Sequence, residues 1–383
     1  VIVMTIIVFT SPQGLLTALH ASAYKYRIVA WLQEIARTIK SFKYTRGTSL
    51  HMEKTDDLLT GYLNSRTAHF RILIKQFWSL ISFKIIITAA MLIIGSYLLV
   101  NQQINVGQFI AADIVIIAIM SSIEKLITNL DTFYEAVVSI EKISVITDAE
   151  TEHSGTIRLS DKKEGVSVEF QNVHFSYSNA EPVLSGVNVS APSGSIIQLK
   201  GPSGSGKSTL LRLLTGAFTD FKGGVLIDEV PVTNYSIESL RAQTGILLGS
   251  QDIFQGTLLE NLTMGNKDIS IDQVNKLASL TGLDSFIKSC KQGYDTMLLP
   301  VGIKLSNNDR RNILLIRALL GSHRLLLLED PFDHLKEPFR SNVINHIRRD
   351  KSCTVLIASQ HDDLSAVCDH IYHLEMNGQI KGS

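Results

Sequence analysis

Two long apolar stretches stand out in the pattern of hydrophobic and polar residues. Lys84 is the only charged residue between Phe77 and Val100, and a second stretch from Val106 to Ile123 is interrupted by Asp113 alone. The first stretch reaches about 36 Å as a helix, which is enough to cross a bilayer with some tilt. Because a short polar link joins the two, we predict a helical hairpin through the membrane. For the second stretch, a helix in the core of a soluble domain is the alternative.

The other residues before the middle of the chain have helical patterning. Apolar residues recur with a 3.6-residue period within 28–39 and again within 131–147, so we expect helices that continue beyond the spans. Residues 1–10 are apolar but too short to cross a bilayer, and they lack the basic region and cleavage site of a signal peptide. We interpret them as the cut end of a membrane helix, which would make the chain a fragment.

The pattern changes near residue 150. Residues 148–165 are charged and contain Ser and Gly, which is typical of a linker, and strand-like alternation begins at Val166. The predicted organisation is a partial transmembrane domain at 1–147, with spans near 1–10, 77–100 and 106–123. A linker at 148–165 and an α/β domain at 166–383 follow it.

Charge in the flanking segments predicts the orientation of the hairpin. Residues 21–75 contain ten Lys and Arg against four acids, whereas the link at 101–105 has no charge. By the positive-inside rule the long segment is cytoplasmic, and so is everything after the second span. Lys84 lies near the cytoplasmic end of its span and can snorkel to the interface. Asp113 lies near the outer end and is expected to meet water rather than substrate.

Composition limits the classes of function. The 36 basic and 36 acidic residues balance, so no bulk charge indicates a nucleic-acid partner. Mean hydropathy is +0.17, with the excess in the first 150 residues. Three dispersed cysteines lack metal-ligand spacing and are expected to be reduced thiols of a cytosolic domain.

One motif carries recognisable chemistry. Residues Gly201, Pro202, Ser203, Gly204, Ser205, Gly206, Lys207 and Ser208 form a complete G-x-x-x-x-G-K-[ST] phosphate-binding loop. An apolar run precedes it, and Thr209 opens a helix-like run after it, which is the strand–loop–helix context that the chemistry needs. Backbone N–H groups at the helix start would hold phosphate oxygens. Lys207 would reach the β- and γ-phosphates, and the Ser208 hydroxyl would bind Mg²⁺. We therefore expect ATP or another nucleoside triphosphate with Mg²⁺.

Further motifs give the loop a family context. In order they are Val166–Tyr177, the phosphate-binding loop, Gln251-Asp252, Leu305-Ser306, Leu325–Pro331 and Thr354–His361. This order and spacing resemble the nucleotide-binding domain of ABC transporters, over about residues 160–383. The preceding part looks like the last portion of an exporter half-transporter. The resemblance implies an all-α membrane-spanning helical domain followed by a P-loop α/β nucleotide-binding domain with a helical subdomain.

The resemblance also assigns roles around the nucleotide. Tyr177 stands where the family stacks an aromatic ring on adenine, although a plain strand aromatic is the alternative. Gln251 stands at the glutamine that reaches Mg²⁺ and transmits the nucleotide state. Where the family has Asp then Glu after an apolar strand, this chain has Glu329 then Asp330. The metal-binding and water-polarising carboxylates are therefore both kept. The first side chain is one methylene longer than in the family, and the second is one methylene shorter.

Other family positions are altered as well. The signature Leu-Ser-Gly-Gly-Gln, which closes over the γ-phosphate of a partner subunit, becomes Leu305, Ser306, Asn307, Asn308 and Asp309. Ser306 keeps the hydroxyl, whereas Asp309 adds a negative charge that is unfavourable near a triphosphate unless it points away. Lys336 replaces the D-loop aspartate, and Gln360 stands at the switch-histidine position with His361 next to it. A one-residue shift would restore the histidine contact.

These features predict the ATP-binding and permease subunit of an ABC exporter, an ATPase that works as a homodimer or heterodimer with a second half-transporter. The alternative is a weakly hydrolysing regulatory half of a heterodimer. A soluble ABC protein acting on DNA or ribosomes is disfavoured by the spans. We expect an integral protein in contact with membrane lipid, in the bacterial inner membrane, with a cytoplasmic nucleotide-binding domain and no nucleic-acid partner. Peptide, protein, lipid and drug substrates all stay open.

Overall fold

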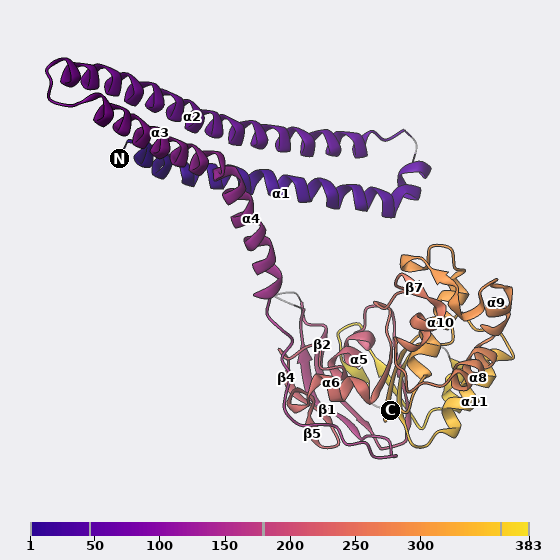
Figure 1. Ribbon diagram of the computed structural model, residues 1–383. Coiled ribbons are helices and arrows are strands. Elements are labelled where there is room, and N and C mark those ends of the chain that lie inside the picture. The colour runs from indigo at the N-terminus through magenta and orange to yellow at the C-terminus, as the bar shows by residue number, and fades with distance from the viewer. Residues whose placement is uncertain (1, 46, 178–180, 361, 382–383) are drawn as a thin grey trace. The chain divides into compact units, whose positions relative to one another are not determined.

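The computed structural model describes residues 2–45, 47–177, 181–360 and 362–381 (Figure 1). It comprises two compact units that divide between Glu150 and Thr151. The first unit is helical. The second contains the strands and the phosphate-binding loop.

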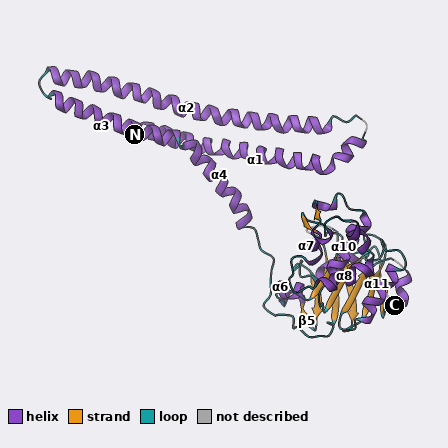
Figure 2. Ribbon diagram, turned by 45° about the vertical axis from the view of Figure 1, so that its right-hand side comes forward, coloured by secondary structure: helices purple, strands orange, loops and turns teal. Residues whose placement is uncertain are grey.

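The helical unit contains long helices that run back and forth. They are α1 (Ile2–Tyr44), α2 (Leu50–Val100), α3 (Val106–Thr128) and α4 (Leu130–Thr147). Helices α1 and α2 lie antiparallel and side by side, and α3 runs back along the end of α2 (Figures 1 and 2). A capping box fixes the start of α3, because the Asn105 side chain accepts from the Gln108 N–H and the Gln108 side chain accepts from the Asn105 N–H.

The apolar helices of this unit expose their hydrophobic surface. Leu50–Val100 and Val106–Thr147 are long and apolar enough to cross a membrane, and each has only 6% of its most apolar window buried. Ile86 and Ile93 of the first predicted span are 64% and 71% exposed, and Ile114 of the second is 61% exposed. A core helix of a soluble domain would bury such residues. The observed exposure therefore favours membrane spans at both stretches over the soluble-core alternative.

Polar contacts hold α1, α2 and α4 together. Buried His69 of α2 contacts Asp131 of α4 through Nε2 at 3.0 Å and the Gly14 carbonyl of α1 through Nδ1 at 3.1 Å. Buried Gln76 donates to the Tyr134 hydroxyl at 3.3 Å. Such groups are costly to bury without partners, so these contacts fix the register of the three helices.

The second unit is built on two main sheets. One is antiparallel, in the order β2 (Leu184–Ala191), β1 (Val168–Phe175), β4 (Lys222–Ile227), β5 (Val230–Pro231). The other runs in the order β12 (Ile380–Lys381), β11 (His370–Leu374), β3 (Ile196–Lys200), β10 (Thr354–Ala358), β9 (Leu325–Glu329), β6 (Thr244–Leu247). It is parallel from β11 to β6, and β12 pairs antiparallel at its edge. A short antiparallel pair joins β7 (Gly256–Thr257) and β8 (Met297–Leu298).

Helices cover the parallel sheet and form a second layer. They are α5 (Lys207–Leu214), α6 (Ile237–Ala242), α7 (Leu258–Thr263), α8 (Ile271–Thr281), α9 (Asp284–Ser289), α10 (Asn307–Leu319) and α11 (Phe339–Arg349). Short 3₁₀ helices occur at Val232–Asn234, Gly293–Asp295, Pro300–Gly302 and Asp362–Ala366. The apolar side chains of β9 and β10 are buried on both faces, which is typical of a parallel strand covered on two sides. One core lies between the two sheets around α5, and the other lies under α7, α8, α10 and α11.

Much of the segment predicted as a linker is attached to the α/β unit. Glu152 forms an ion pair with Arg241 at 2.7 Å, and Ile157 pairs with Tyr235 as an isolated bridge. Buried Arg324 donates to the carbonyl oxygens of Ser160 and Glu164. These partners lie about 80 to 160 residues away in the sequence, so local composition could not reveal them.

Candidate functional site

The phosphate-binding loop lies between β3 and α5 and depends on its glycines. Gly201, Gly204 and Gly206 have φ of +151°, +86° and +94°, which side chains rarely adopt. Space is also short, because a Cβ at Gly201 would lie 2.3 Å from the Leu374 carbonyl oxygen. A Cβ at Gly206, the residue before α5, would lie 2.6 Å from the Leu184 side chain. The loop therefore wraps tightly and leaves the N–H groups at the start of α5 available to an anion.

Lys207 is folded back over this loop. Its Nζ donates to the carbonyl oxygens of Gly201 at 2.6 Å and Pro202 at 2.8 Å. Burial lowers the pKa of the Lys207 ammonium, and the nearby charges of Asp330 and Glu329 oppose that shift. The ammonium is thus held at the mouth of the loop, where a phosphate would neutralise the cost of its partial burial.

Glu329, at the end of β9, reaches the start of α5. Its Oε1 accepts from the Ser208 hydroxyl at 2.5 Å, and its Oε2 accepts from the Gly249 N–H at 2.8 Å. The longer glutamate therefore sits beside Ser208 although the family pattern expects aspartate there. A hydroxyl and a carboxylate side by side are the oxygen ligands that Mg²⁺ prefers, so this pair fits a Mg²⁺ ion.

Asp330 follows in a left-handed backbone conformation, with φ of +43°. Its N–H donates to the Ala358 carbonyl at 2.9 Å, which fixes the turn after β9. Burial raises the pKa of the Asp330 carboxyl, and the charges of Asp333 and Glu329 raise it further against the opposing effects of Lys207 and Arg311. A raised pKa brings a carboxylate closer to the range that suits a general base at neutral pH.

These groups face one pocket of about 630 Å³. Its lining includes these predicted residues: Tyr177, Ser203, Gly204, Gly206, Lys207, Ser208, Thr209, Glu329, Asp330 and Gln360. The Tyr177 hydroxyl lies 3.0 Å from the Thr209 hydroxyl, and its ring meets Phe175 and Phe218 edge to face. Buried Ser205 lies inside the loop, and His361 lies outside the described residues. The pocket is within the usual size range for a nucleotide-sized ligand.

A smaller pocket of about 220 Å³ shares Glu329 and Asp330 with the first. Gln251 lines it, and the Gln251 side-chain oxygen accepts from the Leu248 N–H at 3.2 Å. Arg311 and His334 line it too, and sequence reasoning did not single them out. In the sequence, only the spacing of His334, four residues after Asp330, could have indicated that this histidine lies near the site.

His334 cannot supply positive charge there at neutral pH. Burial lowers its pKa to about 4, with Arg311 adding to the effect and Asp333 opposing it. Its Nε2 lies 2.9 Å from the Asn312 side-chain oxygen. The guanidinium of Arg311, 4.0 Å from the Asp333 carboxylate, brings positive charge to that pocket.

The signature residues lie elsewhere, at the start of α10. Ser306, Asn307 and Asn308 are exposed, and neither pocket is lined by them or by Leu305. The Ser306 hydroxyl donates to the Asp309 carboxylate at 2.6 Å and accepts from the Asp309 N–H at 3.1 Å. The single proton of the Ser306 hydroxyl is thus directed at Asp309, and the contact of this hydroxyl with a partner's phosphate stays a prediction.

Comparison with known proteins shows what the chain is similar to. Residues 184–333 match the family model described as ABC transporter. Over 333 residues the chain is 27% identical to the alpha-hemolysin translocation ATP-binding protein HlyB of Escherichia coli O157:H7, covering 86% of this chain and 47% of that protein. It is 33% identical over 245 residues to the uncharacterized ABC transporter ATP-binding protein YknU of Bacillus subtilis (strain 168), covering 63% and 42%.

A third relative is the ATP-dependent lipid A-core flippase of Legionella pneumophila (strain Lens), at 30% identity over 59% of this chain and 38% of that protein. The chain thus spans less than half the length of these curated relatives. Among solved structures, a bacterial Atm1-family ABC exporter with ATP bound matches with a TM-score of 0.84 and 20% identity, covering 99% of this chain and 67% of that one. That likeness establishes the fold: a helical domain followed by an α/β nucleotide-binding domain.

Proposed function

We propose that this chain, which carries the ATP-binding domain of an ABC transporter, is the ATP-binding and permease subunit of an exporter. In this proposal ATP binding and hydrolysis in the α/β unit drive export through membrane helices that include α2 and α3. The carrying observation is the convergence of Lys207, Ser208 and Glu329 on one pocket at the start of α5.

Within this site each residue has a chemical task. The N–H groups at the start of α5 and the Lys207 ammonium bind the phosphates, and Tyr177 supports the base with its ring. Ser208 and Glu329 would hold Mg²⁺, which would supply charge stabilisation to the phosphoryl group. Asp330, with its raised pKa, orients the attacking water and accepts its proton.

The proposal places this subunit in a dimer with a second half-transporter, in a membrane that we assign to the bacterial inner membrane, with the ATP-binding unit in the cytoplasm. The exposed start of α10 supports the dimer, because a signature that lines neither pocket of its own chain is positioned to meet a partner. The exposed apolar faces of α2 and α3 support the membrane assignment.

Steady-state ATPase of the purified full chain tests the enzymatic half of this proposal. We expect turnover of about 1 s⁻¹ or more, abolished in Asp330→Asn because the variant cannot accept the proton. Lys207→Ala protein, purified in the same way, measures contaminating ATPase. Equal turnover in wild type and Asp330→Asn would rule out the active-enzyme assignment.

One observation favours a second candidate, a weakly hydrolysing regulatory half of a heterodimer. The Ser306 hydroxyl is committed to Asp309, so this signature offers an acidic surface where a partner's γ-phosphate should bind. On this reading the protein binds ATP normally, and its own turnover is negligible until a competent partner is added. Nucleotide binding together with turnover equal to that of Asp330→Asn would select this candidate.

A further inference from the structure

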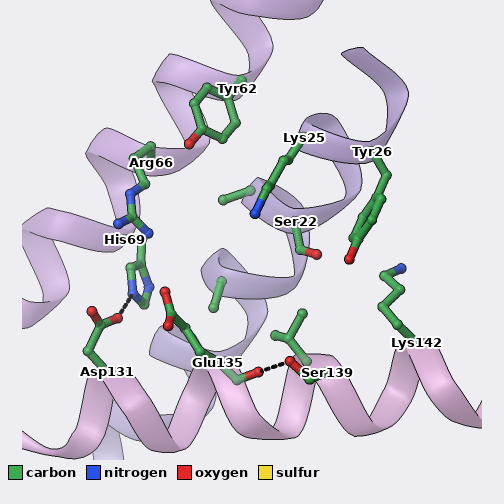
Figure 3. A pocket seen from close by; sticks show the side chains of 13 residues that line it. Ser22, Lys25, Tyr26, Tyr62, Arg66, His69, Asp131, Glu135, Ser139 and Lys142 are labelled. Atoms are coloured by element: carbon green, nitrogen blue, oxygen red, sulfur yellow. Dashed lines mark hydrogen bonds and ion pairs between the residues drawn. The ribbon is translucent and has the colours of Figure 1, made fainter. Parts of the chain in front are cut away.

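We propose that the helical unit contains a second ligand site, an open pocket that binds a small phosphate-bearing anion between α1, α2 and α4 (Figure 3). The pocket has a volume of about 270 Å³. Small residues of α1, Ala18, Ala21 and Ser22, line it together with charged side chains from all three helices. The proposal goes beyond ATP-driven export, because these residues belong to the other unit and take no part in nucleotide binding.

Each helix contributes a cation to the pocket. They are Lys25 of α1, Arg66 of α2 and Lys142 of α4. Among the described residues, none of these cations has an ion pair with an acid, and Lys142 only lies over the Tyr26 ring at 5.8 Å. Figure 3 shows the Lys25 side chain pointing into the space between the helices. The pocket therefore holds three cations that form no ion pair in the described part of the chain.

Two acids, Asp131 and Glu135, line the pocket together with the three cations, so the cations outnumber the acids by one. Asp131 is engaged by His69, whose side chain is 2% exposed and is fixed by Gly14 on α1. Glu135 points into the pocket between His69 and Lys25 (Figure 3), and no described cation pairs with its carboxylate. Arg37 of α1 pairs with Glu34 at 2.6 Å, whereas Lys40, Arg71 and Lys75, like Lys25 and Arg66, are exposed and have no ion pair among the described residues. What sets Lys25 and Arg66 apart is the common pocket that they line.

The chemistry of the cations selects the ligand class. A guanidinium offers a planar fork of donors that suits phosphate oxygens, and an ammonium adds a compact charge beside it. Buried His69 is held by partners on two other helices, so the wall below the exposed Arg66 side chain is fixed before a ligand arrives. The negative charge of Glu135 repels an anion. Removing this charge should therefore strengthen anion binding, which can be tested.

The position along α2 leaves two sources for such a ligand. Arg66 and His69 precede the apolar stretch that begins at Phe77 by about 12 to 17 Å of helix. At this distance from the apolar stretch, the pocket could bind either a lipid headgroup at the membrane surface or a soluble phosphate compound, because both carry the same phosphate oxygens.

Equilibrium binding to the full chain tests the site. The chain carries Lys207→Ala throughout, so that the phosphate-binding loop does not contribute, and is held in phosphate-free detergent buffer of low salt. The probes are inorganic phosphate and dihexanoyl phosphatidylglycerol, titrated calorimetrically. We expect the Lys25→Gln, Arg66→Gln double variant to bind at least about tenfold more weakly. We expect Glu135→Gln to bind severalfold more tightly. Arg71→Gln, which removes an exposed cation of α2 outside the pocket, should bind as the parent does.

The outcomes separate the sources and decide the proposal. Binding of inorganic phosphate supports a soluble ligand, and binding of the short-chain lipid alone supports a headgroup. Failure of both probes to bind, or equal weakening by Arg71→Gln and the double variant, overturns the site. Glu135→Gln keeps all three cations, so it decides the question even if the double variant unfolds. None of these results depends on ATP turnover.

Discussion

We have proposed that two helix starts in the α/β unit meet a phosphate, and the two are built in opposite ways. At α5 the residue before the helix is Gly206, and Lys207 lies beside free N–H groups. At α10 the preceding residue is Ser306, whose hydroxyl is hydrogen-bonded in both directions to Asp309. A helix N-terminus attracts an anion only where its own side chains leave it open. On the proposed function α5 is therefore the stronger phosphate site, whereas α10 supplies its own carboxylate.

The largest expected effect is at α5. Lys207→Ala removes the cation that lies at the mouth of the loop, and we expect ATP affinity to fall about 100-fold or more. Calorimetric titration of the purified chain with ATP and Mg²⁺ measures it. Lys267→Ala, an exposed lysine outside both pockets, is the matched control. Unchanged affinity in Lys207→Ala would remove the basis for contrasting the two helix starts.

The second prediction restores the signature at α10. Asp309→Gln removes the charge and the strong acceptor, so the Ser306 hydroxyl becomes available to a phosphate. We expect steady-state ATP turnover to rise severalfold to about tenfold, with ATP affinity at the α5 site little changed. Asp272→Asn, at the first turn of α8, controls for loss of a helix-start carboxylate elsewhere. A fall in turnover would show that Asp309 supports the signature rather than blocking it.

The third prediction concerns the stability of α10. Ser306→Ala removes the side chain that caps the helix, and we expect the free energy of unfolding to fall by about 1 kcal/mol. Denaturant unfolding of the full chain measures the change. Asn308→Ala alters an exposed neighbour that is not the capping residue of α10, and it should have a smaller effect. An equal loss in both variants would mean that the contact between Ser306 and Asp309 does not hold the helix start.

The smallest expected effect is the cost of ionising Asp330 near Glu329 and Asp333. Because the pKa of this carboxyl is raised in the folded domain, the unfolded chain releases the proton more readily. Its ionisation therefore reduces stability as pH rises from the unfolded value through the raised folded value. Asp330→Asn should stabilise the nucleotide-free protein at pH 7 by less than about 1 kcal/mol, since the group is half-buried and solvent screens it. The gain should vanish below about pH 3.5. A gain that persists at low pH would contradict this electrostatic cause.

Several features of the fold could be predicted from the sequence. The strand, loop and helix around Gly201–Ser208 agree with β3 and α5, because glycine spacing and apolar runs are local properties. The two apolar stretches lie in helices that pass the length and composition test for a membrane span. The predicted linker shows the limit of such reasoning. The residues that attach it to the α/β unit, Arg241 and Arg324, are distant along the chain, so the local sequence does not reveal them.

The sequence by itself determined the phosphate-binding loop, the change from helical to α/β patterning and the reversed order of Glu329 and Asp330. These depend on residue type and short-range spacing. Only the tertiary structure decided that Glu329 reaches Ser208 and that Asp309 holds the Ser306 hydroxyl. It also decided that three unpaired cations share one pocket of the helical unit. A side chain's reach and partner depend on where the folded backbone places it, and contacts as close as Ser306 with Asp309 still require a rotamer that spacing does not specify.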